Sequence, residues 1–499
     1  MALPLLPLLA FTLALIPLYY LASALLAPLR SIPGPFWARF TRWWKFIEIY
    51  HGGFEKTNIE LHSKYGPVVR IAPNEYSIDD PEATKEIYGL GSHFVKSPWY
   101  VASGNPDPHA TADLFTDLDP KRHAVNRRKV ASLYSMTNLV QMEPFVDDCT
   151  GILVKRFTEF AHRGEGVDMG HWLQCYAFDV IGHVTVRSSH SFQYVPIPKN
   201  SLPHPPLLFY PGLFYFDLDL PRGGQLADRF GFLDSGEDIS GIMSAIDDYL
   251  TYLTHVGVFS EWHIPIASFL SRFTQDDTGV SAIKKFTQAQ LMKRTSAASS
   301  FPPSKPSSSK QGAAGGDFLT KLLKIHEEDP EKVDMKDVFT TCMTNIGAGS
   351  DTTSISLGSV IYHLCKYPYS MQTLRQEIDT MEKEGSISNP VTFAETQKMP
   401  YLQAVLKEAL RVHPATGLPL GRVVPKGGKV IAGYAFPEGS IVGINSWVAH
   451  ANTDVFGPDA HIFRPERWLE SKERSAVLDK YFFSMIDERN SLAWVRGLA

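Results

Sequence analysis

The sequence predicts a large, mainly helical globular protein that contains a small amount of β-sheet. Apolar residues recur at helical spacing along extended segments, whereas short alternating runs bounded by glycine and proline are few. The 499 residues are 44 % hydrophobic and 20 % charged, which is ordinary for a chain that forms one large core or two domains. The net charge of -5 gives no electrostatic sign of a nucleic-acid partner.

Residues 1–29 form a long apolar segment that contains no charged side chain. A helix that crosses a bilayer needs about 20 such residues. A cleaved signal peptide is the main alternative, but it would begin with basic residues and have a shorter apolar run. A buried core helix is the other alternative. We therefore expect a transmembrane anchor over 1–29, followed by a globular domain over 30–499.

The residues that follow this segment predict its orientation. The first basic residues of the chain all come directly after it: Arg30, Arg39, Arg42 and Lys45. By the positive-inside rule the globular domain then lies on the cytoplasmic side of the membrane. Tryptophans alternate with these cations, as they do at a membrane interface.

Cysteine usage agrees with a cytoplasmic location. The four cysteines are far apart and form no CxxC pair: Cys149, Cys175, Cys342 and Cys365. The chain also contains no Asn-x-Ser/Thr glycosylation acceptor. Both observations suit a reducing compartment, and neither indicates a zinc module or a disulfide framework.

Several elements follow from the local pattern. The alternating segment "GPVVRIAPNEYSI" predicts a pair of strands, and "GKVIAGYAFPEGSIVGINSWVAH" predicts two short strands around a turn. Helical spacing predicts helices over the following ranges: 122–135, 144–162, 317–329, 333–367 and 399–413. The last of these is stopped by Pro414.

Three segments do not fit a compact domain. Residues 187–228 are rich in proline and aromatics without any period, and such a long irregular loop argues against membership of the fold. Residues 295–316 are a low-complexity linker that we expect to be mobile. Residues 484–499 form a polar tail. We interpret 187–228 and the tail as translated intron or a shifted reading frame.

The sequence "IGAGSDTTS" interrupts a strongly helical segment. Gly347 and Gly349 each cost a helix about 1 kcal/mol relative to alanine. Asp351 and Thr352 place an acid beside a hydroxyl, which is what proton delivery to a bound small molecule would use. Two interpretations remain open. The weak point marks a groove for a ligand, or it is simply a helix end followed by a new N-cap.

Two further motifs follow in order. Glu408 and Arg411 in "KEALR" are three residues apart and share one helix face, which alone is as typical of an exposed, weak ion pair. Arg467 in "FRPERW" is a second cation, held in a proline-rigid turn. Two arginines on one carboxylate would pin this turn to the helix.

The three motifs in this order resemble the cytochrome P-450 monooxygenases, in particular fungal microsomal members of the pisatin-demethylase-like kind. "AGSDTT" is similar to the oxygen-activation groove of the family's long central helix, and "EALR" with "PERW" to its Glu-Arg-Arg triad. The resemblance covers nearly the whole chain. It implies the cytochrome P-450 fold, with Glu408, Arg411 and Arg467 as the structural triad.

The resemblance also implies a haem cofactor held by one cysteine thiolate. Thr352 and Asp351 would be the catalytic residues, the first holding dioxygen and the second supplying protons. Ala348 and Gly349 would lie beside the haem. Its propionates would be bound by three residues: His123, Arg127 and Arg422.

The expected cysteine ligand is missing from these 499 residues. In the family it follows "PERW" by a few tens of residues, in a Phe-x-x-Gly-x-Arg-x-Cys-x-Gly loop. Here "DKYFF" is similar to the start of that loop, but no cysteine follows Cys365. Cys342 lies ten residues before Thr352, roughly 15 Å along the helix, and Cys365 lies roughly 20 Å in the other direction.

The remaining candidates for an iron ligand are weaker. Cys149 and Cys175 lie in apolar helical contexts and are most simply core residues. His450 and His461 could bind iron, but they lack the electron donation of a thiolate, and we expect such loop histidines to be polar surface. We therefore assign no metal-ligating residue, and we expect a fold that is incomplete at the C-terminus.

The leading hypothesis is a haem-thiolate monooxygenase by resemblance, whose activity is impaired because the axial cysteine is absent. Its substrate would be an apolar small molecule of secondary-metabolite type, and its electrons would come from an NADPH-dependent reductase. The location would be the endoplasmic reticulum membrane, with one membrane pass and a cytosolic domain. Two alternatives are a non-catalytic, membrane-anchored protein that binds haem or another ligand, and a membrane-tethered scaffold.

Overall fold

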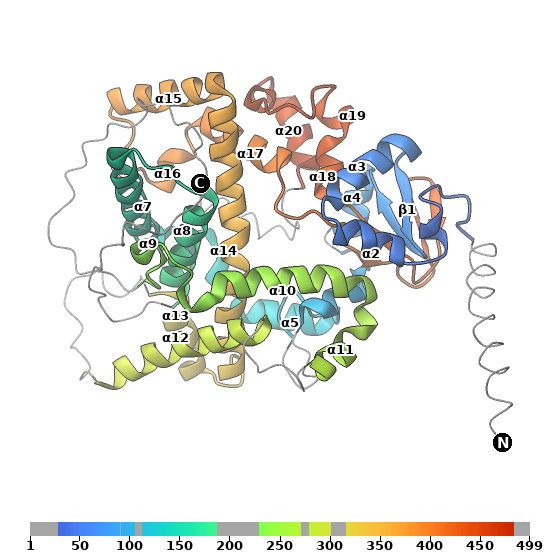
Figure 1. Ribbon diagram of the computed structural model, residues 1–499, viewed down its shortest axis with the longest axis horizontal. Helices are drawn as coiled ribbons and strands as arrows, with labels where there is room; N and C mark the ends of the chain where they lie inside the picture. The colour runs from blue at the N-terminus through green and yellow to red at the C-terminus, as the bar shows by residue number, and fades with distance from the viewer. Residues whose placement is uncertain are drawn as a thin grey trace. The chain divides into compact units, whose positions relative to one another are not determined.

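The computed structural model describes residues 28–89, 91–104, 112–186, 229–270, 279–300 and 316–483 (Figure 1). Helices predominate among them, and the strands form one five-stranded and one two-stranded sheet. The predicted class, mainly helical with small sheets, is therefore confirmed. The chain divides into two compact units: residues 1–125, 251–272 and 400–492, and residues 126–250, 273–399 and 493–499.

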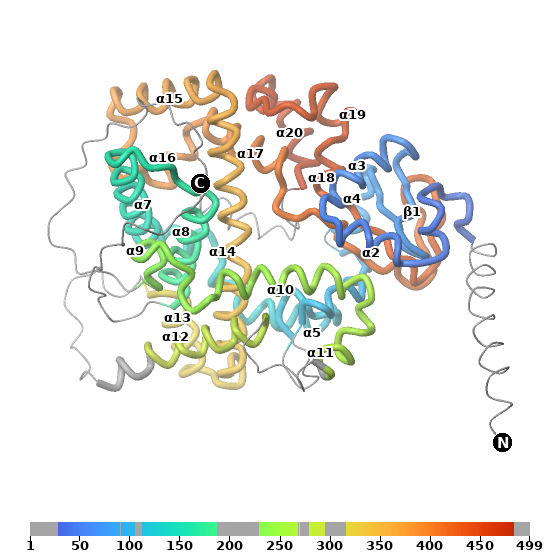
Figure 2. Tube along the Cα trace, in the orientation of Figure 1, coloured from blue at the N-terminus to red at the C-terminus, as the bar shows by residue number. Residues whose placement is uncertain are grey.

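Both described sheets belong to the first unit. The larger has the order β1-β2-β7-β4-β3, in which β2 and β7 are parallel and the other neighbours antiparallel. Figure 2 shows how strands from the two ends of the chain, blue and orange-red, meet in it. The strands are β1 (Val68–Ala72), β2 (Glu75–Ile78), β3 (Val95–Lys96), β4 (Arg422–Val423), β5 (Lys429–Ile431), β6 (Tyr434–Phe436) and β7 (Ile441–Gly443).

The predicted strand pair near residue 70 is confirmed as the antiparallel hairpin β1–β2. Its turn contains Asn74 at φ 58°, a left-handed conformation that asparagine tolerates better than most residues. The second predicted pair is the antiparallel hairpin β5–β6. The next strand, β7, leaves that hairpin and joins the larger sheet, which the local pattern did not predict.

In the first unit, α2 and α3 pack against β1, and α4 shares the apolar core of the sheet (Figure 1). An apolar core joins both sheets and includes Val68, Ile78, Ile431 and Val442. The helices, with η for 3₁₀ helices, are η1 (Trp37–Arg39), α2 (Trp43–Tyr50), α3 (Phe54–Tyr65), α4 (Pro81–Tyr88), η2 (Pro98–Ser103), η5 (Gly257–Trp262), α11 (His263–Leu270), α17 (Pro400–Val412), α18 (Ser446–Ala451), α19 (Thr453–Phe456), η6 (Pro465–Trp468) and α20 (Lys472–Tyr481).

The regular elements of the second unit, among its described residues, are all helices. Its helix α8 packs along α14, and α7 packs against α8 (Figure 1). The helices are η3 (Ala131–Tyr134), α6 (Met136–Val140), α7 (Glu143–Arg163), α8 (Met169–Thr185), α9 (Phe232–Ser235), η4 (Ile239–Gly241), α12 (Val280–Ser300), α13 (Phe318–Glu328), α14 (Met335–Lys366), α15 (Pro368–Lys383) and α16 (Phe393–Thr396). Two further helices contain residues of both units: α5 (Pro120–Val130) and α10 (Ile242–Val256).

The long helix α14 excludes one of the two interpretations of the "IGAGSDTTS" segment. It runs without interruption over 32 residues, from a capping box formed by Asp334 and Asp337. The hypothesis of a helix end and a new N-cap at this motif is therefore wrong. The hydroxyl of Thr352 donates to the carbonyl oxygen of Ala348 at 2.8 Å, so this side chain satisfies its own helix instead of capping a new one.

Several sequence predictions fall largely on residues outside those described. They concern the anchor over 1–29, the segment 187–228 and the tail 484–499. The predicted linker 295–316 is partly described, and there α12 continues through Ser300, since alanines favour helix. Across the described ranges, we find no helix with the length and apolar character that a membrane span requires.

Candidate functional site

The first unit brings Glu408, Arg411 and Arg467 together in its interior. All three side chains are almost completely buried. Arg411, one turn after Glu408 on α17, donates to both carboxylate oxygens at 2.8 and 2.9 Å. Arg467, in η6, donates to Oε1 of Glu408 at 2.9 Å. The alternative of an exposed, weak ion pair is wrong for these residues.

Two more donors complete the surroundings of the Glu408 carboxylate. The indole N–H of Trp468 donates to Oε2 at 2.9 Å, and the backbone N–H of Arg464 donates to Oε1 at 3.0 Å. Burial raises the pKa of Glu408, but the bonds and charges of Arg411 and Arg467 outweigh it and hold the pKa below its ordinary value. This carboxylate therefore stays ionised at neutral pH.

The two arginines also tie the segment 456–468 to α17. Arg411 donates to the carbonyl oxygens of His450, Ala460 and Ile462. Arg467 donates to the carbonyl oxygens of Phe456, Asp459 and Ile462, and to the Asp459 carboxylate. Carbonyl groups of an irregular segment need such donors when they are buried. The cluster is therefore a structural support.

In the second unit, α14 carries Asp351 and Thr352 together with Ala348 and Gly349. Oδ1 of Asp351 accepts a hydrogen bond from the Gln174 amide of α8 at 2.7 Å. Burial raises the pKa of Asp351, although the bond from Gln174 opposes this. A carboxyl whose pKa lies above its ordinary value can exchange protons more readily near neutrality.

The absence of a side chain at Gly349 has a packing explanation in addition to the predicted position beside a haem. A Cβ atom built there would lie 2.9 Å from two side-chain carbons of Ile181 on α8. The same atom at Gly347 would meet nothing closer than 3.9 Å. A side chain at position 349 would therefore force the Ile181 side chain of α8 to shift, whereas one at 347 would not meet such a contact.

Arg422 on β4 is a buried cation with aromatic neighbours. Its guanidinium lies 5.1 Å from the ring centre of Tyr88 and 5.4 Å from that of Tyr100. One nitrogen donates to the hydroxyl of Tyr100 at 2.9 Å and to the carbonyl oxygen of Gly421 at 3.1 Å. Among the described residues no carboxylate forms an ion pair with Arg422. Because a buried charge is costly without a partner, this guanidinium could bind the anionic group of a ligand.

The other two residues expected at haem propionates, His123 and Arg127, lie four residues apart on α5 and so share one face of that helix. His123 belongs to the first unit and Arg127 to the second. Their roles stay predictions.

The four cysteines do not fit the thiolate donor that the resemblance implies. All of them belong to the second unit, whereas the triad belongs to the first. Burial raises the pKa of the Cys149 and Cys342 thiols well above the ordinary value, and raises that of Cys175 to about 12. Cys365 is exposed in the last turn of α14.

No other donor set replaces them in the part of the chain that the structure describes. It contains no group of three or more His, Cys, Asp or Glu side chains that could hold a metal ion. The residues present therefore fit the anionic edge of a haem at Arg422 but not the axial sulfur.

The prediction of a surface position for His450 is wrong. This residue lies in α18 and is buried, because α17 and the end of α20 pack around it. His461 is exposed, as expected. Sequence reasoning also missed Trp468, Tyr88 and Tyr100. Only Trp468 had a signal, since it directly follows Arg467.

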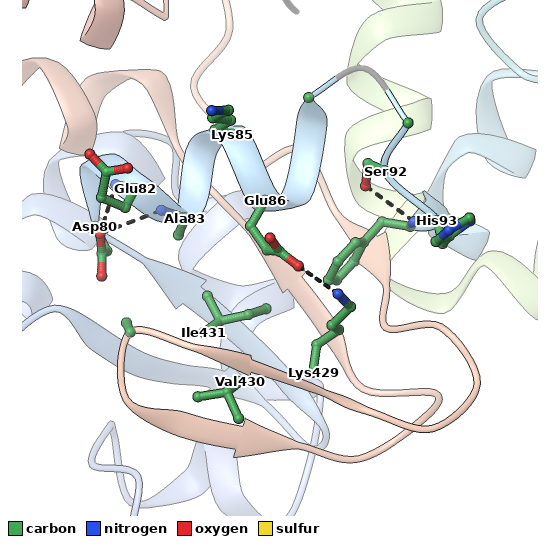
Figure 3. A pocket seen from close by; sticks show the side chains of 14 residues that line it. Asp80, Glu82, Ala83, Lys85, Glu86, Ser92, His93, Lys429, Val430 and Ile431 are labelled. Atoms are coloured by element: carbon green, nitrogen blue, oxygen red, sulfur yellow. Dashed lines mark hydrogen bonds and ion pairs between the residues drawn. The ribbon is translucent and has the colours of Figure 1, made fainter.

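A separate cleft of about 700 Å³ lies in the first unit between α4 and the β5–β6 hairpin. Its walls carry opposite charges, and Lys429 pairs with Glu86 across it at 2.8 Å (Figure 3). Ile431 forms part of its apolar floor. None of the residues predicted for the functional site lines this cleft.

Comparison with known proteins identifies the family. The model of the family described as "Cytochrome P450" matches residues 33–196 and 226–485. A pisatin demethylase of Fusarium vanettenii is 34 % identical over 471 residues, which are 93 % of this chain and 80 % of that protein.

Two other fungal relatives are also named as cytochrome P450 monooxygenases. Cytochrome P450 monooxygenase gsfF of Penicillium aethiopicum is 32 % identical, over 91 % of this chain and 81 % of the relative. Cytochrome P450 monooxygenase cicH of Emericella nidulans is 30 % identical, over 90 % of this chain and 81 % of the relative. The family implies haem iron as the cofactor, a reductase as the electron source and a small-molecule substrate. The chain belongs to the cytochrome P450 family.

Proposed function

We propose that this chain has the scaffold of a monooxygenase for apolar small molecules of secondary-metabolite type, and that its 499 residues do not activate dioxygen. The substrate class is supported by relatives named for pisatin demethylation and for fungal monooxygenases. The scaffold is supported by the buried triad and by the uninterrupted helix that carries Asp351 and Thr352.

The observation that carries the proposal is the position of the four cysteines. Three are buried in helices of the second unit, and the fourth is at the exposed end of α14. Family chemistry depends on electron donation from an axial thiolate. No cysteine follows the triad residue Arg467 in these 499 residues, and this supports the proposal.

Arg422 favours a second candidate, which is haem or ligand binding without catalysis. This cation is buried, and within the described residues it has no carboxylate partner. A carboxylate-bearing ligand such as haem would supply one. A chain that keeps this contact and lacks the axial sulfur would bind the cofactor without activating dioxygen.

The reduced carbon-monoxide difference spectrum of the purified 499-residue chain tests both candidates. A haem spectrum without a thiolate-type band supports binding only, and no haem at all supports the loss of both functions. A thiolate-type band contradicts the proposal. A chimera that carries the segment of a relative with its cysteine, joined after Phe483, is the positive control and should show the band.

We further propose that the chain is anchored in the endoplasmic reticulum membrane by residues 1–29, with its globular domain in the cytosol. The charge-free segment and the basic residues after it support this orientation. Exposed aromatic side chains of the first unit add support. They include Phe36, Trp37, Trp43, Tyr50, Trp262 and Phe269.

Ring and cation contacts within the first unit join α2 to η5 beside Trp43. The rings of Trp43 on α2 and Phe259 in η5 lie 4.9 Å apart, and Arg42 lies over Phe259 at 4.9 Å. Interfacial tryptophans with neighbouring cations are typical of membrane-facing surfaces. Extraction of membranes with alkaline carbonate tests the anchor. A chain that is fully released by this treatment would contradict it, whereas deletion of residues 1–29 should weaken retention.

The segment 187–228 is proposed to be foreign to the fold. The family model leaves 197–225 unmatched, which supports this proposal. The described residues on either side, Val186 and Arg229, are both buried. Sequencing of the mature transcript tests the hypothesis of a retained intron, and a message that encodes the whole segment would remove it.

A further inference from the structure

His450 uses both ring nitrogens, each with a different partner. Nδ1 lies 3.0 Å from the carbonyl oxygen of Arg411, and the backbone N–H of Phe483 donates to Nε2 at 2.8 Å. A carbonyl oxygen can only accept, so Nδ1 carries the proton and Nε2 is the acceptor. The geometry therefore requires a neutral imidazole in one tautomer.

On one side, His450 is bound to the triad. The Arg411 guanidinium donates to the carbonyl oxygen of His450 at 2.8 Å, while the His450 ring donates to the carbonyl oxygen of Arg411. These two hydrogen bonds run in opposite directions between α17 and α18. Glu408 also accepts hydrogen bonds from the Arg411 guanidinium. The His450 imidazole is therefore connected to the buried cluster of Glu408, Arg411 and Arg467.

On the other side, His450 holds the chain where it leaves α20. The ring of Phe482 stacks on the imidazole, with centres 5.4 Å apart and planes 16° apart. The ring of Phe483 packs against Tyr88 at 5.1 Å, and Tyr88 in turn lies under the Arg422 guanidinium. A continuous set of contacts therefore leads from the triad through His450 and Phe483 to Arg422.

We propose that His450 is a positioning residue that sets the direction of the chain after α20. It acts through the Phe483 amide, which it holds at a fixed place relative to α17. The inference deepens the proposed function and rests on it in one respect: the segment after Phe483 is where the family's haem-ligand loop is expected. A histidine that merely filled space would not need a separate partner on each nitrogen.

Two variants of the full chain separate the two hydrogen bonds. In His450→Asn the amide N–H₂ can replace Nδ1, but no acceptor remains for the Phe483 N–H. In His450→Gln the amide oxygen can reach the place of Nε2 and keep that acceptor. Exchange of the Phe483 amide hydrogen, resolved by fragmentation mass spectrometry, should be about tenfold faster in His450→Asn, the effect of losing one buried hydrogen bond. In His450→Gln it should stay close to the wild-type rate.

The control is His461→Asn, because His461 is exposed. It should leave the exchange of the Phe483 amide unchanged. Equal exchange in the Asn and Gln variants would overturn the inference, since then the acceptor at Nε2 does not matter. Amides of α14 report global opening in the same experiment.

A measurement on the wild-type chain keeps the inference testable if both variants unfold. Nitrogen-15 spectra of histidine-labelled protein distinguish the two neutral tautomers. The inference predicts a proton on Nδ1 of His450, and a proton on Nε2 would overturn it. Neither experiment uses haem. A thiolate band in the carbon-monoxide spectrum would therefore refute the proposed function without affecting this result.

Discussion

Replacing Arg467 by alanine removes one of the two cations that face Glu408 inside the first unit. Arg467 is fully buried and makes five hydrogen bonds, one to Glu408 and four to the segment that it supports. At about 1 kcal/mol for each bond the loss is about 5 kcal/mol. Breaking a buried ion pair by removing one partner costs about 3–5 kcal/mol, which agrees. We therefore expect the free energy of unfolding to fall by about 3–5 kcal/mol.

Urea unfolding followed by tryptophan fluorescence measures this loss. The matched control is Arg464→Ala, because Arg464 lies in the same segment and also pairs with carboxylates, but its side chain is 36 % exposed. Exposed pairs contribute little, so the control should lose less than about 1 kcal/mol. If Arg467→Ala is no more destabilised than Arg464→Ala, the triad does not support the fold as argued.

Three further predictions use other parts of the chain. Burial lowers the pKa of His450 to about 3, so the folded state binds fewer protons than the unfolded state below pH 6.5, and stability falls with falling pH. With a pKa of about 3 in the folded state and about 6.5 in the unfolded state, the free energy of unfolding falls by about 2 kcal/mol between pH 7 and pH 5. In His450→Gln the difference between the free energies of unfolding at these two pH values should be smaller than in the wild type. An equal difference would contradict the argument. Gly349→Val should lower the free energy of unfolding by about 1–3 kcal/mol because the new side chain would contact Ile181, whereas Gly347→Ala should raise it by up to about 1 kcal/mol. Calorimetry that finds Gly349→Val more stable than Gly347→Ala would refute the packing argument. Deletion of residues 197–225 should leave the thermal midpoint of the remaining chain unchanged, and a large drop would show that the segment contributes to the fold.

Elements with a strong local period were predictable from the sequence. The helix from Pro400 to Val412 and the hairpin β1–β2 carry their own apolar patterns and stop signals. For these two elements the information lies within a few turns of the chain. The triad was predictable only through the family resemblance, because the spacing of Glu408 and Arg411 places both on one helix face but leaves an exposed pair open, and Arg467 lies 59 residues from Glu408.

Features that depend on distant partners were not predictable. β7 joins the sheet by pairing with β2, a strand more than 300 residues earlier, and three residues of strand give no signal of their own. His450 was expected at the surface as a loop histidine, whereas it lies in the short helix α18, and α17 and the end of α20 bury it. Gly349 suggested a ligand groove, but the reason visible in the structure is the approach of Ile181.

We propose that haem iron bound by this 499-residue chain has no sulfur ligand. Iron X-ray absorption on the purified chain loaded with haem tests it most directly, because sulfur and nitrogen neighbours scatter differently. We expect only nitrogen or oxygen atoms in the first shell, both in the wild type and in a chain whose four cysteines are replaced by serine. A sulfur neighbour in the wild type that disappears in the cysteine-free chain would contradict the claim.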